Sequence, residues 1–201
     1  MALSDAEQKI LFYNSKNLGA SSLLKPNYDY FSRFAGAENL EITSKDEIQT
    51  TTLDNFSKSN QINDLDFMKI DTEGFDLMIL KGAEEIIKNF CLGVQSEVYF
   101  NPVRENLPYF GKVHELMEEY GLNLYVLETI KNGKQKYVKK KNIHPFSYGQ
   151  ILFGEAIFLR DPFIKSKNNN LKFQWNIEKY KKLIFLYEIF NLDDNAYELI
   201  E

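Results

Sequence analysis

Apolar residues along the chain follow two patterns, short runs typical of strands and stripes at helical spacing. The run Phe67 to Asp71 carries one lysine and ends abruptly at two carboxylates, Asp71 and Glu73. Gly74 then allows a sharp turn, after which a helical pattern begins. Further strands are predicted at Leu92 to Phe100, Leu122 to Ile130 and Gln150 to Arg160, and helices at Phe75 to Leu80, Ala83 to Phe90 and Lys112 to Tyr120.

The alternation of these strands and helices predicts the fold class. It is typical of an α/β protein with a mostly parallel sheet, here the later part of a Rossmann-like fold. The strand from Gln150 to Arg160 follows a hairpin-like excursion and is expected to be an antiparallel edge strand. Two earlier strands are predicted at Lys9 to Asn14 and Ile48 to Leu53, the second followed by a short helix with Asp54 as its N-cap.

The C-terminal part of the chain has a different pattern. A polar linker, Lys165 to Asn170, precedes a strongly helical stretch from Ile177 to Phe190, and Asp193 or Asp194 can cap a final short helix. We therefore expect an α/β domain over residues 1–164 and a linker with a helical extension over residues 165–201.

Composition and charge exclude several classes of protein. The 201 residues, 44% of them hydrophobic, are enough for one domain with a real core. A net charge of −5 argues against a nucleic-acid partner, because phosphate contacts need a basic surface. Met1 to Asp5 lacks the pattern of a signal peptide, and no apolar run reaches the ~20 residues of a membrane span. With Cys91 as the only cysteine, we expect a cytoplasmic protein without membrane contacts.

Two local features of the sequence bear on ligand binding. Six lysines between Lys131 and Lys141 flank Asn132-Gly133, which favours a solvated hairpin turn over a phosphate site. The two histidines, His114 and His144, are too far apart for a recognisable metal motif, so no metal site is predicted from them.

The acidic residues at the strand ends are the candidate chemistry. Ligands of α/β proteins bind at the carboxyl ends of the parallel strands, where Asp71, Glu73 and Glu97 are expected. Such carboxylates can accept a proton or position a substrate, and Asp71 with Glu73 could hold a divalent cation. The structural alternative is that Asp71 and Glu73 only cap the helix that starts near Gly74. Lys69, inside the strand, is expected to reach the surface or to pair with a carboxylate.

The segment Lys69 to Gly82 closely resembles the signature of the FkbM family of S-adenosylmethionine-dependent methyltransferases. Weaker similar pieces occur in the family's order at Ala2 to Asp5, Gly19 to Leu23 and Thr51 to Phe56, so that the resemblance covers roughly Ala2 to Arg160. It implies a partial methyltransferase-type Rossmann fold and an O-methyltransferase that acts on a hydroxyl of a sugar, glycan or secondary metabolite. It also implies that Ser4, Asp5 and Asp71 contact the cofactor S-adenosylmethionine.

The chain departs from this family at its start. No glycine-rich turn follows a strand, and the first two strands of such a domain have no counterpart. Three explanations are open: the sequence lacks an N-terminal portion, it completes its sheet with another chain such as a second copy, or it is a degenerate domain. The alternative function is accordingly a non-catalytic binding or assembly module derived from a methyltransferase. A third and weaker hypothesis is a hydrolase that uses Asp71, Glu73 and Glu97.

Overall fold

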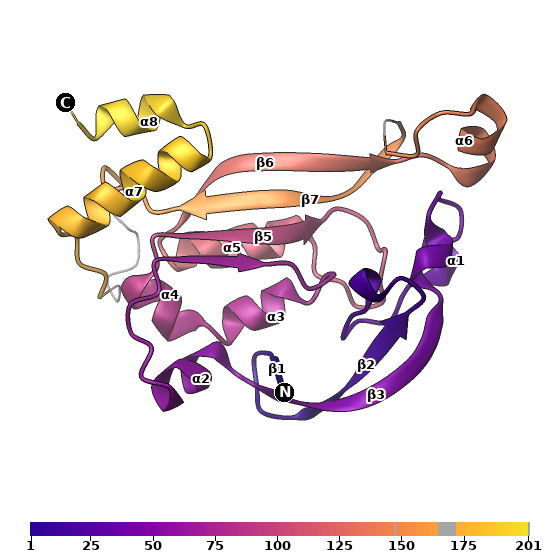
Figure 1. Cartoon of the computed structure of the whole chain (residues 1–201), viewed down its shortest axis with the longest axis horizontal. Coiled ribbons are helices and arrows are strands. Elements are labelled where there is room, and N and C mark those ends of the chain that lie inside the picture. Colours follow the sequence, from indigo (N-terminus) through magenta and orange to yellow (C-terminus); the bar gives the residue numbers. More distant parts are fainter. Residues whose placement is uncertain (147, 165–171, 201) are drawn as a thin grey trace.

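Two β-sheets and the helices packed on them make up the computed structural model, which describes residues 1–146, 148–164 and 172–200 (Figure 1). The α/β class predicted from the sequence is confirmed. The larger sheet has the spatial order β4 (Phe67–Ile70), β5 (Gly93–Tyr99), β7 (Gln150–Leu159) and β6 (Asn123–Asn132). Helices α3 (Asp76–Lys81), α4 (Glu84–Phe90) and α5 (Phe110–Glu119) connect its strands.

The antiparallel strand of the larger sheet lies inside the sheet and not at its edge. Strand β4 pairs parallel with β5, whereas β7 pairs antiparallel with both β5 and β6. Strands β4, β5 and β6 therefore share one direction, as expected, and β6 takes the edge position predicted for β7. A hairpin-like connection makes β6 and β7 neighbours but leaves open which of the two pairs with β5.

The N-terminal strands form a second sheet of their own. Its order is β1 (Ala2–Leu3), β3 (Ile42–Thr51) and β2 (Lys9–Ser15), with β3 parallel to β1 and antiparallel to β2. Helix α2 (Leu53–Ser59) follows β3, and its N-cap is Thr52 rather than Asp54. Asp54 caps α4 instead, because its carboxylate accepts hydrogen bonds from the amides of Glu85 and Ile86 at 2.9 Å each.

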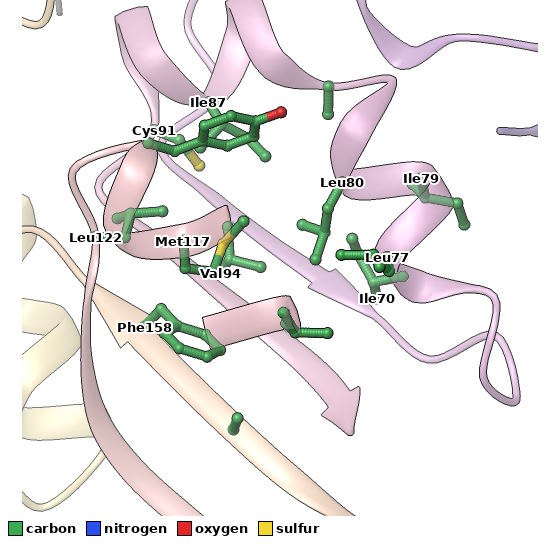
Figure 2. Packing of buried hydrophobic residues seen from close by; sticks show 14 of the residues in the cluster. Ile70, Leu77, Ile79, Leu80, Ile87, Cys91, Val94, Met117, Leu122 and Phe158 are labelled. Carbon is green, nitrogen blue, oxygen red and sulfur yellow. The ribbon is translucent and has the colours of Figure 1, made fainter. Parts of the chain in front are cut away.

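The main hydrophobic core lies between the larger sheet and helices α3, α4 and α5. Alternate residues of β5 and β7, such as Val94 and Phe158, point to this side because side chains alternate along a strand. They meet the apolar stripes of the helices, including Leu80, Ile87 and Met117, all of which are fully buried (Figure 2). This packing fixes the ends of β4 and β5, where the acidic residues lie.

Two smaller cores cover the opposite face of the same sheet. At one end, Ile157 and Leu159 of β7 pack on α7 (Ile177–Ile189) and α8 (Asp193–Glu198). At the other end, Tyr99 of β5 and Leu152 of β7 pack on the segment that holds three short helices: η1 (Leu18–Ala20), α1 (Tyr28–Phe31) and η2 (Ala37–Leu40). The helical stretch predicted from Ile177 is confirmed, but the N-cap of α8 is Leu192, so neither Asp193 nor Asp194 caps it.

The lysine-rich segment forms a helix and not the predicted hairpin turn. After Asn132 ends β6, α6 (Gln135–Lys141) follows and carries lysines in its last turn. Asn132 is buried, and Gly133 donates its N–H to the Pro145 carbonyl at 2.8 Å. Asn132 and Gly133 therefore begin a longer connection between β6 and β7, and this connection contains α6. Within the described ranges, none of the helices combines the length and the apolar character that crossing a bilayer requires.

Candidate functional site

The site is built around the turn that joins β4 to α3. Asp71 follows the last residue of β4, and Glu73 and Gly74 then adopt positive φ angles of 57° and 96°. Glycine suits this position because a φ of 96° strains any residue with a side chain, and a Cβ would also crowd Leu107 Cδ1 at 2.4 Å. A left-handed conformation is uncommon for a glutamate and occurs where the surroundings enforce it. The turn therefore sends the side chains of Asp71 and Glu73 to different places.

Asp76, in the first turn of α3, holds this turn against β5. Its carboxylate accepts hydrogen bonds from Thr72 Oγ1 at 2.7 Å and the Thr72 amide at 3.3 Å. It also accepts from Ser96 Oγ at 3.2 Å and the Glu97 amide at 3.1 Å. Burial raises the pKa of Asp76, and the hydrogen bonds from Thr72 and Ser96 oppose that shift. Asp76 thus fixes the distance between the two acidic strand ends.

Glu73 is paired with the fully buried Arg104. Arg104 Nη2 donates to Glu73 Oε2 at 2.7 Å and to the Ala20 carbonyl at 2.8 Å, and Nη1 donates to the Leu24 carbonyl at 3.3 Å. From the other side, Ser22 Oγ donates to the Glu73 carbonyl at 3.0 Å. The loop from residue 20 to residue 24 is therefore bound to the acidic turn at several points.

Glu97 lies at the end of β5 and is 9% exposed. Tyr99, also buried, donates its hydroxyl to Glu97 Oε2 at 2.7 Å, and Tyr99 Oη lies 3.5 Å from Glu73 Oε2. Burial, followed by the charge of Glu73, raises the pKa of Glu97 to about 9. Glu97 is therefore protonated at neutral pH and can itself donate a hydrogen bond.

Asp71 borders a cavity of about 240 Å³ on the α3 side of the sheet edge. Ser21, Ser22 and Phe75 also line this cavity. The Asp71 side chain is 49% exposed and lies 3.9 Å from Lys69 Nζ, so Lys69 does pair with a carboxylate. The N-cap of α3 is Phe75, no side chain caps it, and the Glu73 carboxylate accepts from Arg104, so the capping role considered for Asp71 and Glu73 is not the arrangement found.

Glu73 and Glu97 border a second cavity, of about 140 Å³. It lies on the opposite face of the sheet, in the core that Tyr99 shares with the short N-terminal helices. The carboxylates of Asp71 and Glu73 therefore face different cavities, with the residue 20–22 loop between them. Over the described ranges, no group of three or more histidine, cysteine or acidic side chains is arranged to hold a metal ion.

Ser4 and Asp5 lie apart from both cavities. The cavity beside Asp71 reaches Ala2 and Leu3, but Ser4 is fully buried and packs its carbonyl on Gly82, at the end of α3. Gly82 is needed for this approach, because a Cβ there would lie 2.0 Å from Ser4 O. The structure thus brings Glu73 and Glu97 together at one cavity. Asp71 borders the other cavity, and Ser4 and Asp5 lie at the far end of α3.

Several residues that shape the site carry no recognisable signal in the sequence. In the sequence, Asp76 looks like an ordinary acidic residue in the first turn of a helix, and Arg104 lies in a loop 31 positions after its partner Glu73. Tyr99 reads as one more aromatic residue of a buried strand. The strand alternation that places Tyr99 on the same face as Glu97 was the one available signal.

Acidic side chains lie at the ends of the neighbouring parallel strands β4 and β5, which is the edge where ligands of α/β folds generally bind. A family model described as the methyltransferase FkbM domain matches residues 1–124. The chain therefore belongs to the FkbM methyltransferase family, and the matched part ends at the start of β6. No match was found among curated proteins, and none among solved structures.

The described residues fit only part of an S-adenosylmethionine molecule. The cavity beside Asp71 offers apolar walls, two serine hydroxyls and a carboxylate. Its volume of about 240 Å³ is below the ~300–1,000 Å³ usual for ligand pockets. The sequence also has no glycine-rich turn that would bring backbone amides close to such a cofactor.

Proposed function

We propose that this chain is an O-methyltransferase that uses S-adenosylmethionine as donor and a hydroxyl of a sugar, glycan or secondary metabolite as acceptor. Family membership supports methyl transfer in general. The observation that carries the finer proposal is the acidic edge of the sheet, where Asp71, Glu73 and Glu97 border two adjoining cavities. A hydroxyl acceptor needs a group to take its proton and groups to orient it.

The three carboxylates differ in the role that each can take. Asp71 is half-exposed and weakly paired with Lys69, so we propose Asp71 as the base that accepts the hydroxyl proton, which requires the acceptor hydroxyl to reach the cavity beside Asp71. Glu73 is neutralised by Arg104, which suits it to orienting the acceptor. Glu97 holds its own proton at neutral pH and is proposed as a hydrogen-bond donor to the acceptor.

The test is methyl transfer from radiolabelled S-adenosylmethionine to a panel of neutral glycosides and polyols. We expect Asp71→Asn to lower turnover by about 10²–10⁴-fold, the usual contribution of a positioned base. The matched control is Asp29→Asn, an exposed aspartate of α1, which should leave turnover unchanged. Equal turnover of Asp71→Asn and the wild-type chain would remove Asp71 from the mechanism.

A binding or assembly module is the second candidate function, and the small volume of the cavity beside Asp71 favours it. Calorimetric titration of the folded chain with S-adenosylmethionine separates the two. Saturable binding supports the methyltransferase, whereas a folded chain that releases no heat of binding supports the module. Turnover of a substrate without added S-adenosylmethionine would instead support a carboxylate-dependent hydrolase.

A further inference from the structure

The cavity between Glu73, Glu97 and Asn132 has an unusual lining for its size. Asn132, the last residue of β6, is 2% exposed, and its Oδ1 atom has no hydrogen-bond partner. A buried amide oxygen without a partner is costly, so it requires an explanation. Asn132 borders the same cavity of about 140 Å³ as the two glutamates. A donor supplied by a ligand would satisfy it.

From this lining, the geometry points to a binding site for an uncharged polyhydroxylated molecule of about the size of one sugar ring. The inference rests on the proposed function, whose acceptor it narrows to a neutral hydroxyl compound. Hydroxyl groups both donate and accept, which suits a cavity bordered by the amide of Asn132, the carboxylate of Glu73 and the acid of Glu97. The volume corresponds to about five water molecules at ~30 Å³ each.

The charges around the cavity favour a neutral ligand. The carboxylate of Glu73 is matched by Arg104 at 2.7 Å. Glu97 is protonated at neutral pH because burial and the nearby charge of Glu73 raise its pKa. An anion would therefore face the Glu73 carboxylate without a cation among the residues that border the cavity, and a cation would find that carboxylate already paired with Arg104.

The apolar part of the lining also fits a sugar ring. Phe31 and Phe153 border the cavity, and aromatic rings pack well against the C–H faces of a ring whose edges carry hydroxyls. Phe146 borders it too and is about half exposed, so the cavity opens to solvent beside this residue. A glycan could thus enter with one residue while the remainder stays outside.

The first test is a titration of the ¹⁵N-labelled chain with methyl α-D-glucopyranoside, methyl α-D-galactopyranoside and methyl α-D-mannopyranoside, followed by NMR. We expect at least one of them to shift the Asn132 side-chain amide and the Tyr99 backbone amide saturably, at millimolar concentrations. Glucuronate and glucosamine serve as the anionic and cationic comparators, and each should bind at least about tenfold more weakly. Tighter binding of either comparator, or no saturable shift at these two residues up to about 100 mM, would overturn the inference.

Two variants sharpen this test. Asn132→Leu should weaken binding of the neutral glycoside about threefold to tenfold, the loss expected for one hydrogen bond between uncharged groups. The matched control is Asn123→Leu at the other end of β6, which should leave affinity unchanged. Equal affinity of the two leucine variants would count against the site.

Neither measurement requires a methyl donor, so the two proposals fail separately. Sugar binding at Asn132 without methyl transfer would count against the proposed function alone. Methyl transfer to a charged acceptor, with no neutral glycoside bound at Asn132, would count against the present inference alone.

Discussion

The proton on Glu97 links the stability of the fold to pH. Its pKa is raised from 4.5 to about 9 by burial and by the charge of Glu73. Between these values the folded chain keeps the proton that the unfolded chain releases, so the folded state binds more protons. The free energy of unfolding therefore falls as pH rises, and the favourable contribution present below pH 4.5 is lost as pH passes through about 9.

Glu97→Gln should remove this pH dependence. The amide keeps an oxygen that can accept from the Tyr99 hydroxyl, but it does not titrate. We expect the variant to gain stability over the wild-type chain as pH rises from 5 to 9, by at most about 1.4 kcal/mol per pH unit. Urea unfolding at several pH values measures this. Glu118→Gln, on the exposed side of α5, is the control, and a pH-independent difference for Glu97→Gln would contradict the assignment.

At the residue scale, the sequence predicted which acids lie at the strand ends but not what surrounds them. Asp71, Glu73 and Glu97 follow from the position at which each apolar run ends. That Asp71 faces one cavity and Glu73 another depends on the positive φ of Glu73 and on Arg104, a partner 31 residues away. Contacts across such separations leave no local pattern, so they could not be predicted from one sequence.

At the scale of elements, Arg160 joins the ends of two helices to the sheet. It follows β7, is buried, and donates to the carbonyls of Ile87, Lys88 and Cys91 at 2.7, 3.0 and 2.7 Å, where α4 ends. It also approaches the Tyr120 and Gly121 carbonyls, where α5 ends, at 3.4 Å. The last carbonyls of a helix lack intrahelical partners and carry partial negative charge, so one cation satisfies both helices.

Arg160→Met should therefore destabilise the fold by about 3 kcal/mol or more, because it retains apolar bulk but leaves several buried carbonyls without donors. Burial lowers the pKa of Arg160 to about 10, which still leaves it charged at pH 7. Urea unfolding at pH 7 measures the loss. Arg33→Met, which removes an exposed arginine, should change stability by less than about 0.5 kcal/mol. Similar losses in the two variants would show that Arg160 does not join these helices.

Most elements of the larger sheet and its helices could be predicted from periodicity, and the exceptions have a physical cause. Asn132-Gly133 has the local signature of a tight turn, yet the connection contains α6. The prediction failed because a two-residue signal does not fix the length of a loop. The position of β7 between β5 and β6 depends on strand pairing across the sheet, to which hydrophobic alternation is insensitive. The separate N-terminal sheet was missed for the same reason.

At the scale of the whole molecule, the C-terminal helices complete one face of the sheet. Leu183 and Leu186 of α7 pack with Leu159 of β7, and the hydroxyls of Tyr125 and Tyr187 lie 3.1 Å apart. Lys179 and Lys182 both bind Asp66, just before β4. These contacts favour C-terminal helices that fold together with the sheet. The division into a domain over residues 1–164 and an extension over residues 165–201 remains a proposal. The predicted linker falls on residues 165–171, which lie outside the described part of the chain.

Leu183→Ala tests whether the helical extension and the sheet unfold as one unit. Leu183 is fully buried, so the substitution should cost about 2–5 kcal/mol. Trp175, the only tryptophan, stacks on Tyr180 of α7 and reports on the extension by fluorescence, while circular dichroism reports on the whole chain. If burial across the shared face couples the two parts, both probes should shift together in urea, and Phe185→Ala, on the exposed side of α7, should shift neither. An early fluorescence transition with an unshifted circular dichroism transition would instead mean that α7 and α8 detach without unfolding the sheet, which would support the division at residue 164.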